Sequence, residues 1–326
     1  MNNVERFKAV MSFRPVDRVP CIEWAEYWDK TVARWHGEGL PTDLVGASNL
    51  RSYFGLDAYD HLWTSPRHTQ YPLPDNVFIK NKNDYHSIKP FLYSDYGHDD
   101  ELRKIAHRHQ CGQSVFWITL EGFFWFPRTL FGIERHLYSF YDEPELMHEI
   151  NNDLADYYVY LLEQISHYCI PDFMTFAEDM SYNHGPMLSE TCFEEFIAPY
   201  YRRIVPILKQ LGIIPFVDSD GNVSELIPWL EKVGIQGILP LERASGIDIQ
   251  EIRSKHPRFR MIGAFDKMVM KNGETAMRTE FDRLLPIMRQ GGFIPSVDHQ
   301  TPPDVSLHNY QCYVSLLKEY SQKAAE

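Results

Sequence analysis

The sequence predicts an α/β fold, a single (β/α)8 barrel over residues 1–326 with an N-terminal helix and an irregular insertion around residues 56–99. Short, continuously apolar segments alternate with long amphipathic ones from residue 114 to residue 320, which indicates parallel strands covered by helices on both faces. The 326 residues accommodate a barrel of ~250 residues with insertions. Because no Gly-x-Gly-x-x-Gly motif follows a predicted strand, a doubly wound sheet is the weaker alternative.

The first predicted elements lie near the N-terminus. Residues 3–11 are expected to form a helix, and residues 18–24 (RVPCIEW) an apolar strand behind it. The stretch from residue 56 to residue 99 is rich in Pro, Tyr, Asn and Asp, which are residues typical of turns. Within it, residues 77–80 and 86–90 are expected to form a hairpin or an insertion.

Six strand–helix units follow. The predicted strands are residues 114–121, 172–179, 213–218, 237–242, 260–266 and 292–299. The helix that opens the series carries Leu146, Ile150 and Leu154 at steps of four, and Ser189 caps the next helix. The predicted helices are residues 143–168, 189–211, 224–233, 248–255, 273–290 and 304–320.

Composition limits the possible partners. The chain has 32 Lys and Arg against 45 Asp and Glu, a formal net charge of −13, which argues against nucleic acid and membrane surfaces as partners. No apolar run approaches the ~18 residues of a transmembrane helix, and residues 1–14 do not resemble a signal peptide, so a cytoplasmic location is expected. The five cysteines form no Cys-x-x-Cys pair, so neither a zinc ribbon nor a disulfide framework is predicted.

Charged residues end every predicted strand. They are Glu23, Glu121, Glu178 with Asp179, Asp218 with Asp220, Glu242, Asp266 with Lys267, and Asp298 with His299. In a barrel these ends meet at the mouth that holds the active site. So many carboxylates repel one another unless a cation compensates them, so a metal ion or a cationic substrate is expected there. The alternative is that each acid only caps the helix that follows it.

Aromatic and histidine side chains stand beside these acids. Phe123 and Trp125 follow Glu121, and Trp24 follows Glu23. Their rings are suited to stack on a flat substrate or to hold a methylated ammonium group, although a hydrophobic lid is the alternative. His299 is expected in the site, and His184 could reach over the same mouth.

Several motifs resemble the uroporphyrinogen decarboxylase superfamily over nearly the whole chain. They are residues 5–7 (ERF), 15–20 (PVDRVP), 218–222 (DSDGN), 291–299 (GGFIPSVDH), 302–306 (PPDVS) and 309–310 (NY). This resemblance implies a (β/α)8 barrel. It also implies either a decarboxylase or a methyltransferase that serves corrinoid proteins, often with zinc.

The sequence departs from the family pattern at two places, and each departure disfavours one of the activities found in the family. The decarboxylases carry an arginine-rich stretch after the first strand, whereas residues 23–29 (EWAEYWD) have no arginine and three acids. A porphyrinogen with many carboxylates would therefore meet like charge. The thiol-directed zinc methyltransferases carry His-x-Cys where this chain has Asp218-x-Asp220. An oxygen-rich site with one histidine suits Zn²⁺ that acts on an ether or hydroxyl oxygen instead.

These arguments predict an enzyme that moves a methyl group from a small methylated donor, such as a methoxylated aromatic, to a corrinoid protein. Glu178, Asp218 and His299 are the expected catalytic residues, and Asp220, Glu242 and His299 the expected Zn²⁺ ligands. The expected substrate-binding residues are Glu23, Trp24, Phe123, Trp125, His184 and Asp298. The alternatives are a uroporphyrinogen decarboxylase, a metal-free methyltransferase for methylated amines, and a binding barrel without catalysis.

Overall fold

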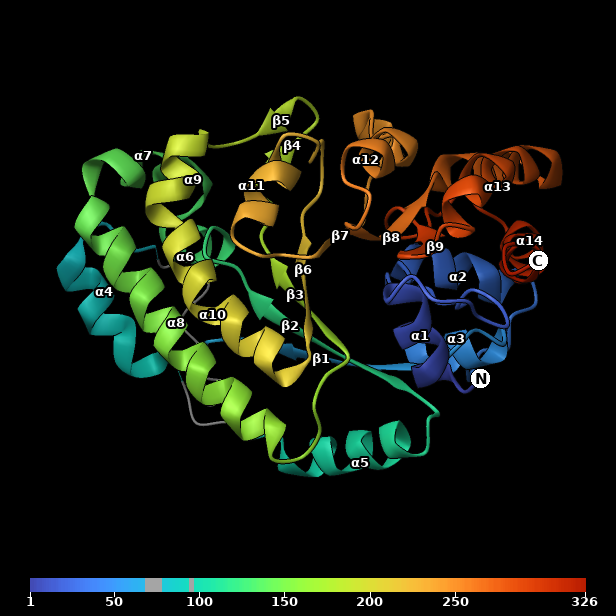
Figure 1. The fold of residues 1–326 in the computed structure, drawn as a ribbon, viewed down its shortest axis with the longest axis horizontal. Helices are drawn as coiled ribbons and strands as arrows, with labels where there is room; N and C mark the ends of the chain where they lie inside the picture. Colours follow the sequence, from blue (N-terminus) through green and yellow to red (C-terminus); the bar gives the residue numbers. More distant parts are fainter. Residues whose placement is uncertain (68–77, 94–96) are drawn as a thin grey trace.

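The computed structural model describes residues 1–67, 78–93 and 97–326. In this part of the chain the main sheet has seven strands in the order β1-β2-β3-β6-β7-β8-β9, and every neighbouring pair is parallel. Figure 1 shows these strands curling around the centre of the molecule with the helices outside them. The strands are β1 (Tyr59–Thr64), β2 (Val115–Glu121), β3 (Phe173–Ala177), β6 (Ile214–Asp218), β7 (Gly237–Leu239), β8 (Arg260–Phe265) and β9 (Phe293–Val297).

The α/β class and the curled parallel sheet are confirmed, but the strand predicted over residues 18–24 is wrong. This segment is assigned to no strand and no ladder. Pro20 has no N–H to donate, and the Cys21 N–H donates to the Asp57 carboxylate at 2.9 Å. The Trp24 N–H donates to Ser296 Oγ at 3.2 Å. Side chains accept these two N–H groups, and the backbone of the segment bonds to Ser321 and Asp57 instead of to a strand. An eighth strand that would close the barrel is therefore not found among the described residues.

The region expected to be irregular contains the edge strand β1. Its Tyr59 pairs with Val115 of β2, so the sheet begins in a stretch that the sequence did not mark. Of the hairpin or insertion expected from residues 77–80 and 86–90, the hairpin is wrong at residues 86–90, because α4 (Lys82–Ile88) and a short 3-10 helix (Lys89–Phe91) occupy that part of the chain. Both helices lie between β1 and β2 in the chain, which agrees with an insertion. Asn81 caps α4 by accepting from the Asn83 and Asp84 N–H groups. Residue 77 lies outside the described residues.

Most of the predicted helices are confirmed. These are α1 (Asn3–Met11), α8 (Pro144–Ser166), α11 (Leu226–Lys232), α12 (Ile249–Lys255), α13 (Glu274–Met288) and α14 (Leu307–Lys323). The helix expected over 189–211 is divided into α9 (Glu190–Phe196) and α10 (Ala198–Leu211). Pro199 enters the first turn of α10, and a proline there cannot continue the preceding hydrogen-bond ladder.

Further elements were not predicted. They are α2 (Asp29–Gly37), α3 (Ala47–Tyr53), α5 (Asp99–Gln110), α6 (Trp125–Phe131), α7 (Ile133–Asp142), a hairpin of β4 (Ser181–Tyr182) and β5 (Gly185–Pro186), and 3-10 helices at Arg243–Ser245 and Lys267–Asn272. Figure 1 shows α8 and α10 side by side outside the first half of the sheet. Among the described residues, no helix has the length and apolar character that crossing a membrane requires.

Candidate functional site

A cavity of about 510 Å³ lies at the carboxyl ends of the strands, where barrel enzymes place their active sites. Its position agrees with the predicted mouth, and its walls come from the segment around Trp24, from β1 and β2, and from the loops after β3, β6 and β9. The lining residues are Trp24, Ala25, Glu26, His61, Trp63, Trp117, Asp179, Asp218, Asp220, His299 and Gln300. Trp24, Asp218, Asp220 and His299 are predicted site residues that the structure brings together here.

Three aspartates crowd one side of this cavity. Burial, followed by the charges of Asp179 and Asp220, raises the pKa of Asp218 well above its ordinary value. Burial and the charges of Asp179 and Glu242 raise the pKa of Asp220 to about 7. Asp179 accepts from the Asp220 N–H at 3.3 Å and holds a left-handed backbone with φ 42°. These carboxyl groups therefore either keep protons at neutral pH or need a cation beside them.

Lys267 supplies a cation near the mouth, and its charge acts on both Asp220 and His299. Its ammonium nitrogen lies 3.5 Å from a Glu242 oxygen and 3.3 Å from an Asp298 oxygen. Asp298 is buried and also accepts from the Arg243 N–H at 2.9 Å, while Glu242 accepts from the Gly221 N–H at 3.1 Å. Lys267 was not among the expected site residues, although its place at the end of a predicted strand was a usable signal.

The three expected zinc ligands do not converge. His299 Nε2 lies 3.7 Å from an Asp220 oxygen, but Glu242 is turned toward Lys267. No group of three or more His, Cys, Asp or Glu side chains among the described residues is placed to hold a metal ion. Burial, followed by the Lys267 charge, lowers the pKa of His299. As arranged here, the residues fit an acid–imidazole pair better than a metal centre.

Glu178 is buried behind the cavity instead of lining it. Its carboxylate accepts from the N–H groups of Phe123, Phe124 and Trp125 at 2.9, 2.8 and 3.2 Å, and from the Tyr201 hydroxyl. Burial raises its pKa to about 7. The contacts show a carboxylate that holds the loop between β2 and α6, and its expected catalytic role stays a prediction.

The other expected substrate-binding residues are spread over different surroundings. Glu23 is buried, with a pKa raised by burial to about 7, and accepts from the Val297 N–H at 3.2 Å. Phe123 belongs to the core, and the Trp125 ring carries the Arg128 guanidinium 4.9 Å from its centre. His184 is exposed in the turn between β4 and β5. The cavity wall contains neither these four side chains nor Asp298.

Two aromatic residues of β1 complete the cavity, and sequence reasoning missed both. The His61 ring stacks on Trp117 with centroids 3.7 Å apart and planes at 12°. Its Nε2 lies 2.8 Å from Thr119 Oγ1, and burial lowers its pKa to about 3, so the ring is neutral at physiological pH. The Trp63 side chain is half exposed. The rings of Tyr59, His61 and Trp63 at alternate positions of β1 were the available signal.

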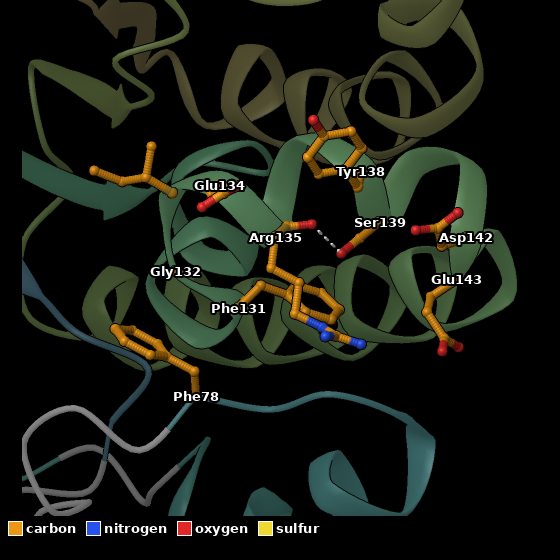
Figure 2. Close-up of a pocket in the computed structure, with 10 residues that line it drawn as sticks. Phe78, Phe131, Gly132, Glu134, Arg135, Tyr138, Ser139, Asp142 and Glu143 are labelled. Atoms are coloured by element: carbon orange, nitrogen blue, oxygen red, sulfur yellow. Dashed lines mark hydrogen bonds between the residues drawn. The ribbon is translucent and has the colours of Figure 1, made fainter.

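A second hollow of about 630 Å³ lies over α7 and the end of α6 (Figure 2). Phe78, Ile133 and Tyr138 line it with exposed apolar surface, and the Ser139 hydroxyl donates to the Arg135 carbonyl at 2.7 Å. It contains none of the predicted site residues. We therefore place the candidate site in the cavity at the strand ends.

Comparisons with known proteins agree with this architecture. The model of the family described as uroporphyrinogen decarboxylase (URO-D) matches residues 128–320, whereas no curated protein gives a match. A methyltransferase from Methanosarcina mazei has a similar structure, with 13% identity, a TM-score of 0.65 and coverage of 98% of this chain and 99% of that chain. A protein from Listeria monocytogenes assigned as a vitamin-B12-independent methionine synthase follows, with 12% identity, a TM-score of 0.50 and coverage of 94% and 97%.

These structural likenesses concern the fold, because the identities are low. The family match is different in kind, since it spans more than half of the sequence. The chain belongs to the uroporphyrinogen decarboxylase family.

Proposed function

We propose that the chain is a methyltransferase that takes a methyl group from a small methylated donor and passes it to the cobalt of a corrinoid carried by a partner protein. The observation that carries this proposal is the lining of the cavity. Four acids and three tryptophans line it, and no Lys or Arg among the described residues does. Tryptophan faces pack well against methyl groups and flat rings.

The lining disfavours the decarboxylase alternative. Uroporphyrinogen carries eight carboxylates, as the family resemblance implies, and would face Glu26, Asp179, Asp218 and Asp220. Burying a carboxylate against another carboxylate without a partner is costly. Lys267 does not relieve this cost, because Glu242 and Asp298 already engage its ammonium group.

Asp220 and His299 are the groups placed to move a proton. They face each other at 3.7 Å in the cavity wall, and the pKa of Asp220 lies at about 7, which suits an acid at neutral pH. When the methyl group departs, the atom that it leaves gains an electron pair, and a nearby acid can protonate that atom. Trp24 fixes this part of the wall, because its Nε1–H donates to the Val297 carbonyl at 2.6 Å.

Zinc would supply Lewis-acid chemistry at the leaving atom. Asp220 and His299 are two of its expected ligands, but Glu242 is turned toward Lys267, and the side chains do not fit a metal as they stand. We therefore assign no step to zinc, which stays an expectation from the family resemblance.

Anaerobic transfer of a methyl group to reduced cobalamin, followed by its visible absorption, tests the proposal. We expect transfer from at least one small methylated donor, and a roughly 100-fold lower rate in His299→Gln, as for the loss of a general acid–base group. His308→Gln, on the exposed face of α14, is the matched control and should keep the full rate. Conversion of uroporphyrinogen to coproporphyrinogen without methyl transfer would contradict the proposal.

A further inference from the structure

The charges at the mouth fall into two groups. Glu242 and Asp298 share the Lys267 ammonium at 3.5 and 3.3 Å. Asp218 has no hydrogen bond or ion pair from its side chain to any described residue, although its carboxylate lines the cavity. Among the described residues, no Lys or Arg side chain therefore forms an ion pair with Asp179, Asp218 or Asp220, whereas Lys267 forms ion pairs with Glu242 and Asp298.

A second group of side chains that line the cavity is aromatic and carries no charge of its own. Trp63 and the stacked pair His61 and Trp117 come from β1 and β2, and Trp24 stands edge-on to His299 with centroids 6.3 Å apart. His61 adds no positive charge, because its buried ring is neutral. Indole faces attract cations through their negative quadrupole, most strongly where water is excluded.

We infer that the methyl donor is a methylated ammonium compound whose cationic head sits between the indoles of Trp24 and Trp63 and the carboxylates of Asp179, Asp218 and Asp220. This inference rests on the proposed function and names its donor class. Carboxylates and indoles together select a methylated cation over a neutral ether of the same shape, because only the cation gains from both groups of side chains. A volume of about 510 Å³ falls in the ~300–1,000 Å³ range of small-molecule sites.

The transfer is balanced in atoms and electrons. The electron pair of the nucleophilic acceptor forms the new bond to the methyl carbon, while the carbon–nitrogen bond breaks and its pair stays on nitrogen. A quaternary ammonium donor thereby becomes a neutral tertiary amine. The amine is a base, so the acid pair of Asp220 and His299 can protonate its nitrogen once the methyl group has left.

Calorimetry of the full chain with a charge-matched pair of probes tests the inference. Choline chloride is compared with 3,3-dimethylbutan-1-ol, which has the same shape without the charge. We expect choline to bind at least about tenfold more tightly. Equal affinity for the two probes, or binding of the neutral alcohol alone, would overturn the inference.

Variants separate the two groups of side chains. Asp218→Asn keeps the shape of the side chain and removes a carboxylate, and Trp63→Leu removes a half-exposed indole. Each of these variants should weaken choline binding about tenfold. Trp63→Phe keeps an aromatic ring and should therefore retain most of the wild-type affinity for choline. Asp142→Asn, in the other hollow on α7, is the control and should bind choline as the wild type does. Unchanged thermal unfolding confirms that each variant is folded. Wild-type affinity in both Asp218→Asn and Trp63→Leu would overturn the inference.

The methyl-transfer assay keeps the two proposals distinct. Transfer from choline, in a protein that prefers choline over the alcohol, supports both. Transfer from a methoxylated aromatic without choline binding overturns the donor class and leaves the methyltransferase function in place. Selective choline binding without transfer from any donor overturns the proposed function and leaves cation binding supported.

Discussion

Carboxylates at similar positions in the sequence have different roles in this protein. Glu178 and Asp218 both stand at predicted strand ends. Glu178 accepts three backbone N–H bonds and one hydroxyl bond behind the cavity, whereas the Asp218 carboxylate faces the cavity with no hydrogen bond or ion pair to a described residue. Gly122 makes the first arrangement possible, because a Cβ at that position would lie 2.0 Å from the Glu178 carboxyl carbon. The hydrogen-bond partners of a carboxylate, rather than its residue type, therefore determine whether it holds a loop or faces the candidate site.

Glu178→Gln should destabilise the fold by about 2 kcal/mol, because the amide nitrogen would face backbone N–H donors that then lose their acceptor. Chemical denaturation measures the change. Glu195→Gln, on the exposed side of α9, is the control and should stay within ~0.5 kcal/mol of the wild type. Equal stability of Glu178→Gln and the wild type would show that the buried carboxylate does not hold the loop.

Lys267→Ala should create a metal site from acids and an imidazole that, as they stand among the described residues, do not fit a metal ion. Removing the ammonium leaves Glu242 and the buried Asp298 without their cation, near Asp220 and His299, and a divalent ion can replace it. Zinc should therefore raise the melting temperature of this variant and not that of the wild type. Lys271→Ala, which loses an exposed ion pair with Asp304, is the control. Stoichiometric zinc in wild-type protein purified without chelators would contradict the prediction.

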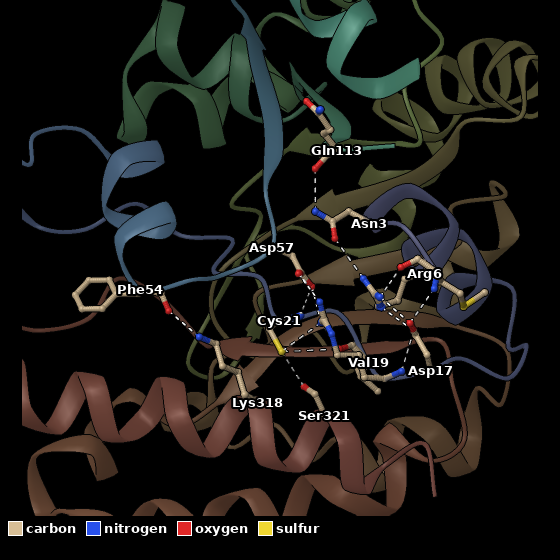
Figure 3. A network of polar contacts seen from close by, with 12 residues as sticks. Asn3, Arg6, Asp17, Val19, Cys21, Phe54, Asp57, Gln113, Lys318 and Ser321 are labelled. Atoms are coloured by element: carbon tan, nitrogen blue, oxygen red, sulfur yellow. Dashed lines mark hydrogen bonds and ion pairs between the residues drawn. The ribbon is translucent and has the colours of Figure 1, made fainter. Parts of the chain in front are cut away.

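At the scale of elements, the segment over residues 18–24 is held in place by side chains as well as by its backbone, without a strand. The Arg18 guanidinium binds both oxygens of Asp57 at 2.7 and 2.6 Å, and Asp57 also accepts from the Cys21 N–H. Figure 3 shows this network, in which Cys21 Sγ donates to Ser321 Oγ of α14 at 3.3 Å. Asp57 thereby ties the segment that carries Glu23 and Trp24 to the start of β1.

Asp57→Asn should lower the free energy of unfolding by about 2–3 kcal/mol, because a largely buried guanidinium loses its two-point partner. The melting temperature and the denaturation midpoint report this loss. Glu251→Gln breaks the exposed Lys255–Glu251 pair and should cost under ~0.5 kcal/mol. A similarly small effect of Asp57→Asn would show that the segment is held by packing alone.

At the scale of the whole molecule, buried histidines and buried glutamates change the stability of the fold with pH in opposite directions. Burial lowers the pKa of His61 and of His136 to about 3, so below pH ~6.5 the unfolded chain takes up protons that the folded chain does not, and stability falls. Burial raises the pKa of Glu23 and Glu178 to about 7. These carboxyls favour the folded state at low pH and lose that contribution as the pH rises from ~4.5 to 7.

The variant His136→Phe tests how much a buried histidine contributes to the loss of stability at low pH. His136 is fully buried between Phe124 and Phe140, and neither of its ring nitrogens has a hydrogen-bond partner among the described residues. Between pH 4 and 6.5 the variant should lose up to ~1.4 kcal/mol less stability per pH unit than the wild type, as measured by denaturation at several pH values. His308→Phe, at an exposed position, should keep the wild-type slope. Parallel slopes for His136→Phe and the wild type would contradict the assignment.

The sequence by itself determined the alternation of strands and helices and the edge at which the acids gather. Strands buried on both faces are continuously apolar, so residues 114–121 and 292–299 were recognised to within a few residues of β2 and β9. Asp218, Asp220 and His299 meet because the carboxyl ends of parallel strands share one edge. Local pattern was sufficient for these features, since burial on both faces leaves a local signature.

Only the tertiary structure decided which acids face the cavity and what closes its aromatic wall. β1 is an edge strand with a mixed burial pattern, so its sequence did not stand out, and His61 and Trp63 were missed with it. Lys267 forms ion pairs with Glu242 and Asp298, which lie 25 and 31 positions away in the sequence. Glu178 points away from the cavity because it accepts from N–H groups that lie 53 to 55 positions away. Such contacts depend on how loops fold back over the sheet, and spacing along the chain does not encode that geometry.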